Sequence, residues 1–104
     1  MTDNKNTTTI DQSLILSSVR ALWGCITPSL VSVSTEIQDN TILWQCIFDS
    51  SADETDLELL SSAAAELIAA FNTCNLKEII KKVPYPNKTE HLRNIIYLRY
   101  ERKK

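Results

Sequence analysis

The chain has 104 residues, of which 43% are hydrophobic and 23% are charged, as is typical of a folded domain. This length suits one domain, and no apolar run approaches the roughly 18 residues that cross a membrane. The single glycine disfavours a phosphate-binding loop, and the net charge of −2 disfavours a nucleic-acid-binding domain. The polar start MTDNKNTTT has no apolar signal region, so we expect a cytoplasmic protein.

Charge is distributed unevenly along the chain. Residues 1–76 hold 10 acids and 2 bases, a balance of −8, whereas residues 77–104 hold 9 bases and 3 acids, a balance of +6. The two balances sum to the net charge of −2. This pattern indicates a dipolar surface, whose two halves either neutralise each other within the fold or face a charged partner.

The first predicted element is a helix that follows a flexible polar tail, residues 1–8. Thr9 and Gln12 match a capping box, so the helix is expected to begin there and to run to about Trp23. Gly24 follows at once, as expected for the left-handed residue that ends a helix. The apolar stripe expected to face the core consists of Ile15, Val19 and Leu22, with Leu14 and Trp23 at its edges.

Two alternating segments predict a β-hairpin. Residues 30–38 and 41–49 each alternate apolar and polar side chains, and Asp39-Asn40 between them tolerates the backbone of a tight turn. The heavier apolar face of the second strand consists of Ile42, Trp44, Cys46 and Phe48.

The acidic stretch DSSADETD, residues 49–56, leads into the most regular helical pattern of the chain. Apolar residues step by three and four from Leu57 to Phe71, which predicts a helix. Ser51 and Glu54 have the spacing of a capping box that opens this helix.

Two further strands are expected over residues 76–83 and 92–101. Pro84 ends the first of these segments, and the second alternates so that Ile96, Leu98 and Tyr100 share a face expected in the core. The element order α-β-β-α-β-β predicts an α+β fold, with a mostly antiparallel four-stranded sheet and both helices on one face. Residues 9–104 are expected to form this single domain.

The sequence offers no pattern for catalysis or metal binding. A calcium loop starting at Asp49 would need glycine at position 54 and glutamate at position 60, where the chain has Glu54 and Leu60. His91 is the only histidine and lies in a polar connection. The cysteines are odd in number and isolated, so we expect reduced thiols, no cofactor and no enzyme activity: they are Cys25, Cys46 and Cys74.

The candidate partner-binding residues belong to the acidic stretch and the helix after it. This helix carries acids and no Lys or Arg, so it lacks the pairs of opposite charge that exposed helices commonly form. Its charge is therefore neutralised either by the basic C-terminal strands or by a basic partner protein. The candidate residues are Asp49, Asp53, Glu54, Asp56 and Glu58.

Two alternative functions remain. The last strand interleaves basic and aromatic residues, as an RNA-binding module would. A homo-oligomeric structural protein or adaptor would instead associate through a sheet face, such as that of Leu43 and Ile47, or through the last strand.

Four segments together resemble a known family: ALWGCITPSLVSV, CIFDSSADETDLELLSSAAAELIAAF, VPYP and IIYLRYE, within about residues 20–101. They are similar to immunity proteins of contact-dependent growth inhibition systems, which are encoded beside polymorphic toxins. This resemblance implies a cytoplasmic protein that binds and neutralises one toxin domain, often a nuclease. The expected partner is therefore the toxin's C-terminal domain, with a homodimer possible and with no small molecule, nucleic acid or membrane bound directly.

Overall fold

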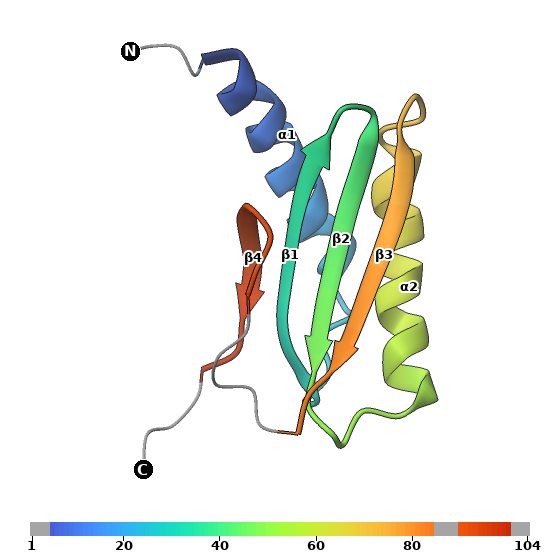
Figure 1. Cartoon of the computed structure of the whole chain (residues 1–104). Coiled ribbons are helices and arrows are strands. Elements are labelled where there is room, and N and C mark those ends of the chain that lie inside the picture. The colour runs from blue at the N-terminus through green and yellow to red at the C-terminus, as the bar shows by residue number, and fades with distance from the viewer. Residues whose placement is uncertain (1–4, 85–89, 101–104) are drawn as a thin grey trace.

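The computed structural model describes residues 5–84 and 90–100, which form two helices and one four-stranded sheet (Figure 1). In chain order the elements are α1 (Lys5–Leu22), β1 (Leu30–Gln38), β2 (Thr41–Phe48), α2 (Glu54–Ala69), β3 (Asn75–Lys82) and β4 (Asn94–Leu98).

The sheet has the strand order β3-β2-β1-β4 and mixed direction. Strand β1 pairs antiparallel with β2 and with β4, whereas β3 runs parallel to β2. The expected mostly antiparallel sheet is therefore wrong. The reason is α2, which carries the chain back along the sheet to the start of β2, so that β3 runs in the same direction as β2.

The β1–β2 hairpin has its turn where the sequence predicts it. Gln38 pairs with Thr41, and Asp39 between them adopts the left-handed conformation with φ of 55°. The predicted apolar face of β2 is also confirmed, because Trp44, Cys46 and Phe48 are fully buried. Exposure does not alternate along the whole strand, since Gln45 and Ile47 of the other face are buried as well.

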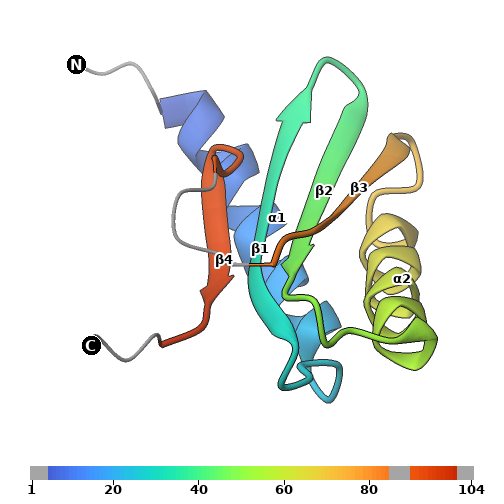
Figure 2. The same ribbon diagram turned by 60° about the horizontal axis from the view of Figure 1, so that its bottom comes forward.

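Both helices lie on the same side of the sheet (Figures 1 and 2). Helix α1 packs against β1 and β4, α2 packs against β2 and β3, and the two helices contact each other. The core lies between the helices and the sheet, and its largest buried side chains are Leu14, Leu30, Val33, Ile42, Trp44, Phe48, Leu60 and Leu67.

Helix α1 begins earlier than the sequence predicts, and its buried face agrees with the prediction only in part. It starts at Lys5, so Thr9 lies within the helix rather than at its N-cap, and only residues 1–4 of the expected tail lie outside the described residues. Val19 is 52% exposed and Trp23 is 87% exposed, so neither belongs to the core. Leu14 and Leu22 are buried as predicted, and the other buried side chains of α1 are Ser18 and Ala21. Small side chains at 18 and 21 allow the close approach of a neighbouring element.

Helix α2 begins with a capping box that differs from the predicted one. Asp53 is the N-cap and accepts a hydrogen bond from the backbone N–H of Asp56, whose carboxylate accepts one from the backbone N–H of Asp53. Ser51 instead donates its hydroxyl and its backbone N–H to the carboxylate of Asp49. Ser51 and Glu54 therefore do not form the expected box.

Residues 90–92 lie across the face of the sheet that the helices leave open. Gln45 Nε2 donates to the carbonyl of Glu90, His91 Nε2 lies 3.0 Å from Ser32 Oγ, and the backbone N–H of Leu92 donates to Ser34 Oγ. These contacts explain why Ser32, Ser34 and Gln45 are buried although they point away from the helices.

Strand β4 is shorter than the predicted strand, residues 92–101, and the side chains that it turns toward the core are not the predicted ones. A register shift between Val33 and Ser34 of β1 interrupts its pairing with β4, so that Ile96 and Tyr97, adjacent in sequence, both pack against the core. Leu98 is 61% exposed and Tyr100 is 83% exposed, which corrects the expectation that both lie in the core with Ile96.

Candidate partner-binding surfaces

Asp49, the first candidate acid, is neutralised within the fold. Its Oδ2 lies 2.9 Å from Arg99 Nη1, and its Oδ1 accepts from Ser51. The hydrogen bonds from Ser51 and then those from Arg99 hold the pKa of Asp49 below its usual value. The basic C-terminal region therefore supplies the counter-charge for this residue.

Asp53 and Asp56 serve the start of α2. Each accepts a backbone hydrogen bond of the capping box, and Asp56 Oδ2 also accepts a hydrogen bond of 2.8 Å from Ser29 Oγ. Their negative charge suits the N-terminal end of the helix dipole. Asp56 is half-buried by these contacts, whereas Asp53 remains exposed.

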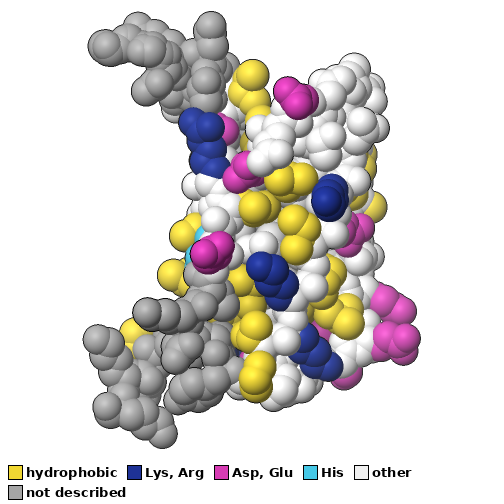
Figure 3. Space-filling view, in the orientation of Figure 1, with side chains coloured by type: hydrophobic (Ala, Val, Ile, Leu, Met, Phe, Trp, Pro, Cys, Tyr) yellow, Lys and Arg dark blue, Asp and Glu magenta, His cyan; other side chains and the backbone are white. Residues whose placement is uncertain are grey.

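Glu54 and Glu58 are exposed acids of α2, as is Glu66 further along the helix. Within residues 5–84 and 90–100, ion pairs join only Arg93 to Asp11 and Arg99 to Asp49, so none of the three glutamates is paired. We call Asp53, Glu54 and Glu58 the acidic surface of α2. Figure 3 shows acidic side chains gathered at the lower right edge of the molecule, on the side where Figure 1 places α2.

Basic side chains lie on the opposite face of the sheet. Lys77 and Lys81 of β3 are exposed and stand in register with Leu43 and Ile47 of β2, which point away from the helices. Figure 3 shows the face of the sheet that the helices leave open, on which lysine and arginine side chains flank hydrophobic ones. In the fold, the excess of acidic residues therefore lies at the surface of α2, and basic residues lie on the open face of the sheet.

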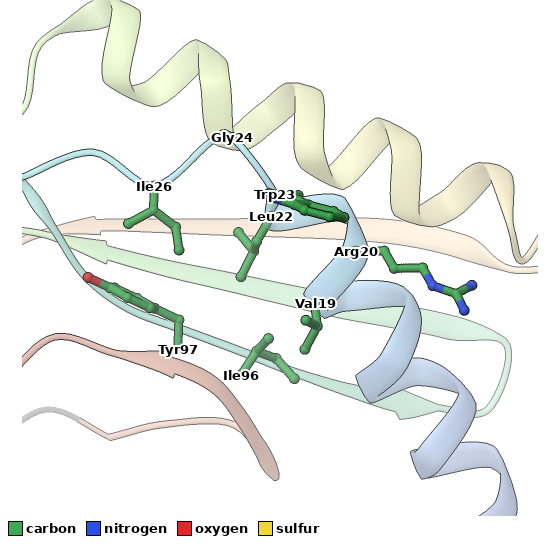
Figure 4. Close-up of a pocket in the computed structure, with 8 residues that line it drawn as sticks. All are labelled: Val19, Arg20, Leu22, Trp23, Gly24, Ile26, Ile96 and Tyr97. Carbon is green, nitrogen blue, oxygen red and sulfur yellow. The ribbon is translucent and has the colours of Figure 1, made fainter.

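An apolar groove of about 470 Å³ lies between the end of α1 and β4 (Figure 4). It exists because the two helices leave part of β4 uncovered, while the bulged pairing turns both Ile96 and Tyr97 toward the helix side. Its lining residues are Val19, Arg20, Leu22, Trp23, Gly24, Ile26, Ile96 and Tyr97.

The sequence contains a signal for this groove. Helix α1 and the residue after it have more apolar side chains than one buried stripe requires, namely Ile15, Leu16, Val19 and Trp23 in addition to Leu14 and Leu22. A surplus of this kind indicates either a helix buried on all sides or a second, exposed apolar face. The sequence pattern predicts Val19 and Trp23 on the core side because spacing alone does not distinguish the two faces.

The groove is connected to the start of α2 by the segment after α1. Ile26 lines the groove, Thr27 Oγ1 lies 3.1 Å from Ser29 Oγ, and Ser29 Oγ donates to Asp56. Arg99 Nη1 holds the same segment by donating to the carbonyl of Pro28 at 2.7 Å. This segment thus joins the edge of the groove to the side of α2 that carries Asp56, whereas Glu54 and Glu58, two positions before and after Asp56, lie on the opposite side of the helix.

The described residues show no cluster of metal ligands and no disulfide. No three His, Cys, Asp or Glu side chains of this part of the chain come together as metal ligands. The three cysteines form no disulfide, and burial followed by the nearby charge of Glu78 raises the pKa of Cys46 to about 12. Neither described helix has the length and apolar character to cross a membrane.

Comparison with curated proteins gives no match. A protein-family model, described as MafI2 immunity protein, matches residues 11–101. This match covers both helices but for the first turns of α1, all four strands, the apolar groove and the acidic surface of α2. The chain therefore belongs to the MafI2 immunity protein family.

Proposed function

We propose that this protein neutralises a cognate toxin by binding its C-terminal domain directly in the cytoplasm, without catalysis of its own, and that this toxin is a nuclease. Family membership supports toxin neutralisation. The observation that supports direct binding to a basic protein is the acidic surface of α2, where Glu54 and Glu58 have no cation among the described residues.

A nuclease fits this surface for an electrostatic reason. An enzyme that binds the phosphate backbone needs a cationic face. Exposed carboxylates on an inhibitor speed the encounter with such a face and compete with phosphate for it. The acidic surface of α2 is thus suited to covering the nucleic-acid-binding site of a toxin.

The five acids have different parts in this proposal. Glu54 and Glu58 are free to meet a partner, and Asp53 combines an exposed charge with its capping role. Asp49 and Asp56 act by shaping the start of α2, because Arg99 and Ser29 already engage their carboxylates. The proposed contact residues are therefore Asp53, Glu54 and Glu58.

The test is co-expression with the C-terminal domain of the toxin encoded beside the gene, followed by co-purification and growth measurement. The wild type should form a complex and restore growth. Glu54→Gln with Glu58→Gln should lower the association rate about tenfold at low salt. Asp39→Asn is the matched control, since it removes one charge at the β1–β2 turn and asparagine tolerates its left-handed backbone. Absence of a complex and of rescue with the wild type would refute the proposal.

The structure gives the two alternatives less support. Arg93 and Arg99, two of the cations that RNA would meet, are engaged by Asp11 and Asp49. Ile47 is fully buried, so association through the face of Leu43 and Ile47 lacks its apolar contact. A homodimer through β4 remains a proposal, which sedimentation of the purified protein would test.

A further inference from the structure

We infer that the outer edge of β3 binds an extended segment of the toxin domain as an additional β-strand, with basic side chains of that segment facing α2. This inference rests on the proposed function and states how the toxin domain would be held. Backbone hydrogen bonds to β3 would supply the main contact, and the acids of α2 that lie along the same edge would select the charge of the segment.

Strand β3 is an edge strand, and no other strand of the described residues pairs with its outer side (Figure 1). On its inner side, the backbone N–H groups of Asn75 and Val83 donate to the carbonyls of Asn40 and Phe48. Because the backbone groups of successive residues in a strand point to opposite sides, those of every second residue between them point outward. A row of unpaired N–H and C=O groups can accept a further strand. The outward groups belong to Leu76, Glu78, Ile80 and Lys82.

The edge also has apolar surface that an added strand would cover. Ile80 stands in register with Cys46 of β2, which is fully buried, yet Ile80 itself is 40% exposed. A strand paired with β3 would lie about 5 Å from it and would bury this side chain against its own. The edge thus offers an apolar contact in addition to backbone hydrogen bonds.

Helix α2 places acidic side chains along this edge. Ser61 Oγ donates to Glu78 Oε1 at 2.9 Å, so the side of α2 that carries Ser61 faces β3. Glu58 and Glu54 precede Ser61 by three and seven positions, which places them on the same side of the helix. Among the described residues neither glutamate has an ion pair, and Lys82 at the end of β3 has none either. The edge of β3 is therefore bordered by unneutralised negative charge on the helix side.

The charges on the two faces of β3 define the segment that would fit. On the helix side, the side chains of an added strand would lie near Glu54 and Glu58, which favours Lys or Arg. On the open face they would lie beside the exposed Lys77 and Lys81, which favours acidic or polar residues. Because side chains alternate between the faces of a strand, the segment should alternate basic residues with acidic or polar ones.

A second copy of this chain fits the edge less well. Two β3 edges that pair antiparallel are related by a two-fold axis perpendicular to the joined sheet, so both α2 helices would lie on the same face of it. Glu54 and Glu58 of one copy would then lie close to those of the other, and like charges repel. A strand with basic side chains meets the same acids with attraction.

Hydrogen exchange measured by NMR tests the edge directly. The isotope-labelled protein is compared alone and in the complex co-purified with the unlabelled C-terminal domain of the toxin encoded beside the gene. Binding should slow exchange at the outward amides of Glu78 and Ile80 about tenfold or more, because each gains a hydrogen bond. The amide of Ile79 points to β2 and should change less. This alternation distinguishes an added strand from a contact made by side chains alone.

A proline substitution gives a second measurement. Ile80→Pro removes an outward N–H and no hydrogen bond to β2, so an edge strand tolerates it. It should raise Kd about tenfold through the lost backbone hydrogen bond. Leu98→Pro is the matched control at the other edge of the sheet, because Arg99 N–H donates to the carbonyl of Val31 and the preceding amide therefore points away from β1. This control should leave Kd unchanged, and circular dichroism compares the folding of both variants.

The outcomes separate this inference from the function on which it rests. If the toxin domain binds and the outward amides of β3 exchange as fast as in the free protein, the edge is not the binding site although the proposed function stands. If these amides are protected in the free protein, and more strongly at higher concentration, a second copy covers the edge and the inference is wrong. If the wild type does not bind the toxin domain, the proposed function itself is refuted.

Discussion

Arg99 Nη1 lies 2.9 Å from Asp49 Oδ2, which joins the basic end of the chain to the acidic stretch that precedes α2. Arg99 also donates to the carbonyl of Pro28, so one guanidinium connects β4, the end of β2 and the segment after α1. The C-terminal region thus neutralises part of the acidic stretch, whereas Glu54 and Glu58 have no ion pair among the described residues.

The pH dependence of stability should report this ion pair. Because the pKa of Asp49 is lowered in the fold, its contribution is present above the unfolded value of about 3.9 and is lost as the pH falls through the folded value. Asp49→Asn should therefore lower the free energy of unfolding by about 1 kcal/mol near neutral pH. The difference from wild type should shrink below about pH 4. Urea denaturation at several pH values measures it, and an Arg99→Met background should reduce the effect.

Variants of Asp53 should separate helix capping from toxin binding. Asp53→Ala should lower the free energy of unfolding by about 1 kcal/mol, because the first turn of α2 loses its side-chain acceptor. Asp53→Asn keeps an acceptor and should leave stability nearly unchanged while slowing association with the toxin domain. Thermal unfolding and binding kinetics measure the two effects. Equal losses of stability for Ala and Asn would show that charge rather than capping matters here.

Substitution of Gly24 should cost stability through its backbone conformation alone. Its φ is 84°, and an added Cβ would have no atom within 4 Å. Gly24→Ala should therefore lower the free energy of unfolding by about 1–2 kcal/mol, whereas Gly24→Asn should cost less because asparagine tolerates the left-handed region. Urea denaturation compares the two variants. A larger loss with asparagine than with alanine would contradict a backbone origin.

Thiol labelling should distinguish Cys46 from the other cysteines. Burial and the charge of Glu78 raise its pKa to about 12, so near pH 8 almost none of it is thiolate, the form that reacts. Iodoacetamide should modify the half-buried Cys25 and Cys74 first and should modify Cys46 only after unfolding in urea. Peptide mass spectrometry follows each site. Comparable labelling of all three in the folded protein would show that the sheet opens around Cys46.

The parts of the fold that were predicted correctly depend on local pattern. The bounds of β1, the turn at Asp39 and the buried face of β2 follow from alternation and from a residue that tolerates positive φ. The left-handed Gly24 follows from its place after a helix. The direction of β3 was missed because no local pattern states which strand it joins.

The exposure of the candidate surface residues was predicted in part, for a similar reason. Glu54 and Glu58 follow from the absence of basic residues in α2, and they are exposed as expected of a charged surface. The groove was missed because Val19 and Trp23 have the spacing of a buried stripe, and only the position of α1 over β1 and β4 shows which side of the helix faces solvent.

The sequence by itself determined the elements, their order and the charge of each segment, because periodicity, turn residues and ionisable side chains act over a few neighbouring positions. Only the tertiary structure decided which acids are neutralised and which apolar residues remain exposed. Asp49 meets Arg99 across fifty positions of chain, and Trp23 is exposed after the end of α1, where it lines the groove beside β4. Such contacts depend on the packing of whole elements, which no short stretch of sequence contains.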